Sequence, residues 1–123
     1  MPIVIIECRE GVTTDVKAGV AKDVTKAIQE IILSPLDLIS VVFHDIPAHS
    51  TYRSGEPTSE TLIFCHIRSG RTDETILNLG KAMSKIWSGR TGASENEIEV
   101  VVATYPAKYV VRGGERMEEP PYV

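Results

Sequence analysis

Three residues of this chain could do chemistry together: a proline behind the first methionine, and two arginines near the middle of the sequence. Removal of Met1 exposes Pro2 as a terminal secondary amine. An α-amino group titrates at about 7.7–8.0, and burial or nearby cations favour its neutral form. A neutral amine is a general base, or a nucleophile toward carbonyl carbon. Arg68 and Arg71 flank a turn that precedes a predicted helix, and paired guanidinium groups at a helix N-terminus suit a carboxylate.

A tandem repeat could bring these residues to one place. Residues 3–56 align without a gap on residues 62–115. The aligned identities include Arg9 with Arg68, Gly11 with Gly70, Lys22 with Lys81, Arg53 with Arg112 and Pro47 with Pro106. The copies differ where chemistry is expected, because Arg71 replaces Val12 and only the first copy begins with a proline. We therefore expect one site per chain.

Each copy has the pattern of a strand, a helix and a second strand. β-branched runs predict the strands, and apolar residues on one helical face predict the helices. The predicted elements are residues 3–8, 15–33 and 38–46 in the first copy, and 62–67, a helix after Thr72, and 98–103 in the second. Thr13 or Thr14 is the expected N-cap of the first helix, and Ser34-Pro35 the expected stop. Residues 49–60 are predicted to link the copies.

These elements predict an α/β fold in which two βαβ units share a four-stranded mixed sheet with two helices on one face. We expect a single domain over residues 1–123, built from repeats 1–56 and 61–115 with an extended tail at 116–123. If the first strands of the two copies are antiparallel neighbours, Pro2 lies beside Arg68 and Arg71. The other face of the sheet is rich in Ile, Val and Leu, which predicts an oligomer. A ferredoxin-like fold, in which the copies interleave, is the alternative.

Composition excludes several classes of partner. The net charge of −4 argues against nucleic acid, because phosphate binding needs a basic surface. The apolar runs are shorter than the roughly 18–20 residues of a membrane span, and the first residues do not resemble a secretory signal, so a cytoplasmic location is expected. Cys8 and Cys65 lie in predicted strands and are expected to be small buried hydrophobes. No histidine has metal-ligand spacing, so we do not expect a metal.

The proline start, the paired βαβ units and several short segments resemble one known family. The segments are Gly70-Arg71-Thr72-Asp73-Glu74, Phe43-His44-Asp45-Ile46-Pro47-Ala48 and Tyr105-Pro106-Ala107. With the R-x-x-R spacing, they are similar to the tautomerase superfamily (4-oxalocrotonate tautomerase-like), and most similar to its cis-3-chloroacrylic acid dehalogenase group. The resemblance covers almost the whole chain. It implies a homotrimer without a cofactor, in which Pro2 is the catalytic amine and Arg68 and Arg71 bind the carboxylate of a small 2-oxo or unsaturated acid.

The chain departs from these relatives at specific positions. The dehalogenases have a histidine, a tyrosine and a water-activating glutamate where this chain has Ile28, Val101 and Arg112. Loss of the glutamate argues against hydrolytic dehalogenation, and Arg112 adds a cation as a further candidate site residue. The short 4-oxalocrotonate tautomerases have an arginine where this chain has Ser40, which argues against dicarboxylate substrates.

Three functions are consistent with this sequence. The first is a keto–enol tautomerase, with phenylpyruvate-type enols as test substrates. The second is a hydratase, dehalogenase or decarboxylase of a three-carbon unsaturated acid. For it, Asp37 lies near the catalytic aspartate of malonate semialdehyde decarboxylases, and an aspartate at a strand entry is also a common turn former. The third is a non-catalytic oligomeric binding protein of the same fold. Tyr52, in the linker, is a further candidate to line the pocket.

Overall fold

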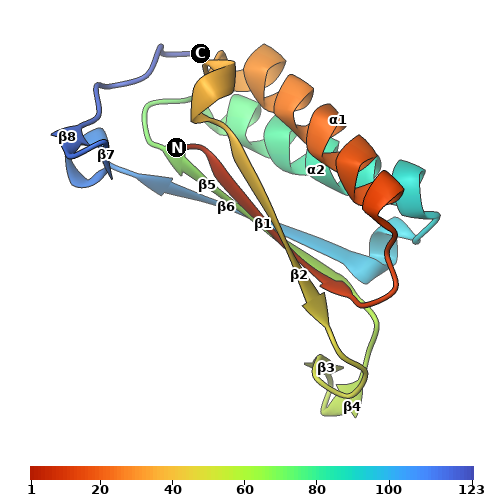
Figure 1. Cartoon of the computed structure of the whole chain (residues 1–123). Helices are drawn as coiled ribbons and strands as arrows, with labels where there is room; N and C mark the ends of the chain where they lie inside the picture. The colour runs from red at the N-terminus through yellow and green to blue at the C-terminus, as the bar shows by residue number, and fades with distance from the viewer.

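The computed structural model describes residues 1–123 and shows two layers, a four-stranded sheet with both helices on one face (Figure 1). The main elements are β1 (Ile3–Arg9), α1 (Thr14–Ile32), β2 (Ser40–Ile46), β5 (Thr61–Arg68), α2 (Asp73–Thr91) and β6 (Ile98–Tyr105). The strand order is β2-β1-β5-β6. Pairs β1–β2 and β5–β6 are parallel, and the central pair β1–β5 is antiparallel. Each copy therefore keeps its own βαβ unit, the predicted fold is confirmed, and the ferredoxin-like alternative is wrong.

Both helices begin in the same way. The hydroxyl oxygens of Thr13 and Thr72 accept hydrogen bonds of 3.2 Å from the N–H groups of Val16 and Thr75, which satisfies a donor that the first turn leaves free. Of the two predicted N-caps of α1, Thr13 is the cap and Thr14 is the first residue of the helix. Helix α1 ends one residue earlier than predicted, because Leu33 adopts a left-handed conformation with φ of 55°.

The core lies between the helices and one face of the sheet. Alternate residues of β1 and β5 point to this face, as the period of two in a strand requires. The buried set, from both halves, is Val4, Ile6, Cys8, Val20, Val24, Ile28, Ile32, Ile63, Cys65, Ile67, Leu79, Met83 and Trp87. Both cysteines are buried and unpaired, as expected, and burial raises the pKa of Cys65 to about 12.

Leu79→Ala is expected to lower the free energy of unfolding by about 2–5 kcal/mol, because Leu79 is fully buried and its truncation leaves a cavity. Leu77→Ala is the matched control on the same helix. Leu77 is 58% exposed, so its truncation should change the free energy of unfolding by less than about 0.5 kcal/mol. Chemical denaturation measures both. Equal losses in the two variants would contradict the assignment of this core.

Two short hairpins were not predicted. The expected linker contains β3 (Tyr52–Arg53) and β4 (Glu56–Pro57), and the second copy has β7 (Val111–Arg112) and β8 (Glu115–Arg116) at equivalent places. Hairpin β7–β8 lies near both chain termini, whereas hairpin β3–β4 lies at the opposite end of the sheet (Figure 1).

The predicted bounds of two strands were also wrong. A 3-10 turn at Leu36–Leu38 precedes β2, which starts at Ser40 rather than at residue 38. Strand β6 runs to Tyr105, two residues beyond the predicted end.

The other face of the sheet carries no helix. Its centre is apolar, and its side chains include Ile3, Ile5, Val42, Leu62, Phe64 and Val101. Ile3, Val42 and Val101 are each at least 39% exposed. We call this surface the open face. No helix of the chain combines the length and apolar character needed to cross a membrane.

Candidate active site

The pairing of β1 with β5 places Pro2 at the end of the sheet where Arg68 lies. Ile3 pairs with His66, so Pro2 is one step beyond this pair, toward Arg68. Pro2 is fully buried, and its carbonyl oxygen accepts a hydrogen bond of 3.0 Å from the Ser40 N–H. We call this place the amine corner.

The amine corner favours an uncharged terminal amine. Burial lowers the pKa of the Met1 amine below its ordinary value of 8.0, and the charges of Arg112 and then Arg68 lower it further. Both effects penalise the ammonium form. Both act on the Met1 nitrogen, which lies one residue before Pro2.

Arg68 and Arg71 are buried cations, at 6% and 7% exposure. Arg71 donates hydrogen bonds to the Arg68 carbonyl oxygen and, at 3.4 Å, to the Ile32 carbonyl oxygen at the end of α1. Burial lowers the pKa of both guanidinium groups, and the Arg68 charge adds to the fall of the pKa of Arg71 to about 10. The Nε atom of each arginine is buried without a hydrogen-bond partner. Two buried cations with unused donors form a place that an anion can stabilise.

The tail crosses the turn that carries both arginines. Arg68 donates a hydrogen bond to the Glu118 carbonyl oxygen, and the Thr72 N–H donates to the Val123 carbonyl oxygen at 2.9 Å. The sequence predicted an extended tail but not its path. Residues 117–123 therefore cover the arginine turn of their own chain.

Glu119 is a candidate site residue that the sequence did not indicate. Its Oε2 lies 3.9 Å from the place that a Cβ on Gly70 would occupy, and its charge raises the pKa of Arg68 against the effect of burial. Gly70 has a φ of 114°, a backbone conformation that residues with a side chain rarely adopt. Nothing in the Glu118-Glu119-Pro120-Pro121 sequence indicated a contact with a turn about 50 residues away.

Arg112 differs from its counterpart in the first copy. Arg53 donates to Glu60 and Glu97, each at 3.1 Å, and so connects the first hairpin to the sheet region. Arg112 is exposed and forms no such ion pair. Its charge lowers the pKa of the Met1 amine. The structure thus brings Arg112 to the amine corner.

The two remaining predicted residues are placed differently. Asp37 is exposed in the 3-10 turn before Ser40, at the same end of the sheet as Pro2, but it forms no ion pair. Tyr52 is 55% exposed in hairpin β3–β4 at the opposite end. Within one chain, the structure does not bring Tyr52 to the amine corner.

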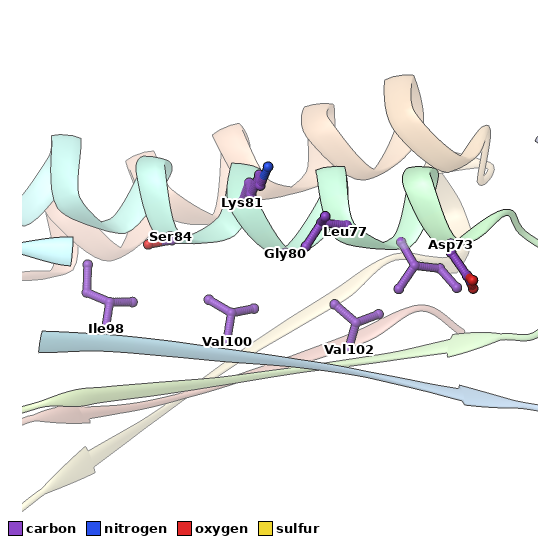
Figure 2. A pocket seen from close by; sticks show the side chains of 9 residues that line it. Asp73, Leu77, Gly80, Lys81, Ser84, Ile98, Val100 and Val102 are labelled. Atoms are coloured by element: carbon purple, nitrogen blue, oxygen red, sulfur yellow. The ribbon is translucent and has the colours of Figure 1, made fainter. Parts of the chain in front are cut away.

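The largest hollow lies elsewhere, between α2 and the edge strand β6. This groove of about 430 Å³ has Ile98, Val100 and Val102 along its floor (Figure 2). In the first copy Phe43 takes the place of Val102, and its ring packs 6.5 Å from that of Trp87. The groove contains neither the amine nor the arginines, so its size does not make it the catalytic site.

The first half of the chain resembles known proteins in sequence. A family model described as "Tautomerase enzyme" matches residues 2–60, beginning at Pro2. A probable tautomerase of Lactococcus lactis subsp. lactis (strain IL1403) is 39% identical over 56 residues, which are 46% of this chain and 92% of the relative.

Solved structures extend the similarity to both halves. N1, a member of the cis-3-chloroacrylic acid dehalogenase family, superposes with a TM-score of 0.92 at 24% identity, over 97% of this chain and 85% of N1. F6 fused 4-OT, an asymmetric trimer, gives a TM-score of 0.89 at 20% identity, over 94% of this chain and 95% of that one. These two likenesses show the fold, and the curated relative carries the sequence relationship. The chain belongs to the tautomerase family.

Proposed function

We propose that this protein is a cofactor-free keto–enol tautomerase that acts on a small 2-oxo or unsaturated carboxylic acid. Pro2, freed by removal of Met1, is the acid and base, and Arg68 and Arg71 bind the substrate carboxylate. The observation that carries the proposal is the amine corner, where the antiparallel register puts the fully buried Pro2 at the end of the sheet that holds the buried Arg68.

The proposed reaction needs no group that the chain lacks. The neutral Pro2 nitrogen takes a proton from the carbon next to the carbonyl. The C–H electrons form a C=C bond, and the carbonyl π electrons move to oxygen. The enolate oxygen then takes a proton from solvent and the protonated Pro2 returns its proton to solvent, so the enol is released and the neutral amine is regenerated. Ketonisation runs the same steps in reverse. Binding of the carboxylate by buried guanidinium groups fixes the carbon within reach of the amine.

We also propose a homotrimer of single-domain chains in the cytoplasm, without nucleic acid or membrane as a partner. The apolar open face supports association, and the fused 4-OT relative is a trimer. A core that takes residues from both halves supports one domain. Light scattering on the purified protein gives the mass of the assembly.

The wild-type protein is expected to accelerate ketonisation of a phenylpyruvate-type enol, because the enol carries both the carboxylate and the reacting carbon that the site requires. Loss of enol absorbance measures the rate, and solvent deuterium at the carbon next to the carbonyl reports the proton transfer. The matching alcohol or ester, which lacks the carboxylate charge, is the control substrate. Equal turnover of acid and ester would contradict the proposed binding of the carboxylate by Arg68 and Arg71.

Hydration or dehalogenation of a three-carbon unsaturated acid is the second candidate. Glu119 favours it, since this carboxylate lies beside the arginine turn and could activate water in place of the glutamate that Arg112 replaces. Release of chloride from a 3-haloacrylate would favour this reaction. Asp37, without a partner, is the corresponding candidate for decarboxylation, with carbon dioxide release from malonate semialdehyde as the readout.

A further inference from the structure

Tyr105 lies directly beside Arg68 on the open face. The two residues are register partners of the parallel strands β6 and β5. Ile63, Cys65 and Ile67 point into the core, so Arg68, two places from His66, lies on the opposite side of β5. Tyr105 follows the same alternation on β6, and its carbonyl oxygen accepts a 2.7 Å hydrogen bond from the Ser69 N–H. The phenol and the buried guanidinium therefore belong to one corner of the sheet.

His66 fixes the position of the Tyr105 hydroxyl group. The His66 Nδ1 and Tyr105 Oη atoms are 2.7 Å apart, and the ring centroids are 5.6 Å apart. His66 in turn pairs with Ile3 on β1, the residue after Pro2. His66 thus lies between β1, which follows Pro2, and Tyr105, on the open face.

The contact between His66 and Tyr105 exists only in the second copy, which carries Arg71. The first copy has Glu7 in place of His66 and Ile46 in place of Tyr105, and Ile46 cannot donate a hydrogen bond. Glu7 instead contacts His44 at 2.7 Å. The second half therefore has the phenol next to the buried arginine, and the first half does not.

We propose that Tyr105 is a catalytic residue that donates a hydrogen bond to the carbonyl or enol oxygen of the substrate, and that His66 is its positioning residue. The inference rests on the proposed tautomerase function. Its chemical basis is that deprotonation of carbon moves an electron pair to the substrate oxygen, which then carries negative charge. A donor already aimed at that oxygen lowers the barrier without costly reorganisation.

The spacing fits a 2-oxo acid. In such a substrate the carboxylate and the carbonyl are on adjacent carbon atoms, so their binding groups must be neighbours. Arg68 and Tyr105 are register partners on adjacent strands, whose backbones lie about 4.8 Å apart, so the two side chains leave the sheet side by side. In the tautomer with its proton on Nδ1, His66 donates to Oη, and the phenolic hydrogen is left for the substrate. The hydroxyl keeps its proton in this role, and the proton removed from carbon goes to Pro2.

Tyr105→Phe is expected to lower kcat for the enol about 100-fold or more with little change in KM, as for the loss of one oxyanion donor. His66→Ala should lower kcat in the same direction by less. His66→Asn should recover part of that loss, because its amide nitrogen can donate from a place close to that of Nδ1. Steady-state kinetics on the assembled protein separate these effects, and light scattering confirms that each variant assembles.

His44→Ala is the matched control, because it breaks a 2.7 Å histidine contact on the same open face away from Arg68. Its kcat should equal that of the wild type. Wild-type kcat in Tyr105→Phe or in His66→Ala overturns the inference. If Pro2→Ala and Arg68→Ala lose activity while Tyr105→Phe keeps it, the inference fails and the proposed function stands. If the wild type turns over no enol, both fail. If Tyr105→Phe does not assemble, His66→Ala, with the phenol intact, decides.

Discussion

A chain whose Pro2 nitrogen is capped by an amide is expected to have no turnover above background, and release of that nitrogen should restore it. An amide nitrogen has no basic lone pair, so it cannot take the proton from carbon. General-base catalysis contributes about 10²–10⁴-fold, which sets the size of the loss. The test uses one protein with a cleavable extension before Pro2, assayed before and after cleavage. Intact mass shows which form is present, and the same measurement on untagged protein shows whether Met1 is removed in the cell.

The dependence on pH checks the same prediction. Pro2 acts as a base only when it is neutral, so kcat/KM should rise as the pH rises through its pKa. Burial and the charges of Arg112 and Arg68 lower the pKa of the Met1 amine, and the same surroundings should put the midpoint for Pro2 below the pKa of a free prolyl amine. Arg112→Ala removes one of these charges and should move the midpoint to higher pH.

Pro2→Ala should lower kcat less than the amide cap does. It keeps a terminal amine but loses the ring that is fully buried and fixes the backbone. Full activity in the capped chain would mean a mechanism without the proline, whereas no turnover before or after cleavage would leave only the non-catalytic binding function.

The elements could be predicted because two independent patterns agreed. The helical period of apolar residues gave α1 nearly correct bounds and gave the start of α2, and the repeat suggested β1 and β5 as antiparallel neighbours. Pro2 and Arg68 are close together because an antiparallel register joins the start of one strand to the end of the other. That argument uses only backbone geometry, which explains why it could be made before any side chain was placed.

The missed features depend on contacts between distant segments. Tyr105 precedes Pro106 and was predicted to lie beyond the strand, but pairing with Arg68 extends β6 through it. The path of the tail across Gly70 follows from hydrogen bonds to residues about 50 positions away. A pattern of apolar and polar residues does not encode such contacts.

Arg68→Ala is expected to lower kcat/KM by about 30- to 1000-fold, which corresponds to roughly 2–4 kcal/mol of transition-state binding. The guanidinium is buried with an unpartnered Nε, so the substitution removes a cation and a free donor from the place proposed for the substrate carboxylate. Arg71→Ala should cause a loss of similar size for two reasons. It removes a second buried cation, and it removes the hydrogen bond that holds the Arg68 carbonyl. Arg71→Lys keeps the charge but loses the planar fork of donors, so it should recover little activity.

The repeat supplies the matched control for this prediction. Arg9 is the counterpart of Arg68 in the first copy, but it is only half-buried and no arginine lies three residues after it, because that place holds Val12. Arg9→Ala should therefore leave kcat/KM unchanged. Unfolding curves for all variants separate lost binding from lost structure, which matters most for Arg71 because it also caps the end of α1 through the Ile32 carbonyl. Equal kinetic losses in Arg9→Ala and Arg68→Ala would mean that both arginines stabilise the fold. The proposal that Arg68 binds the substrate carboxylate would then be wrong.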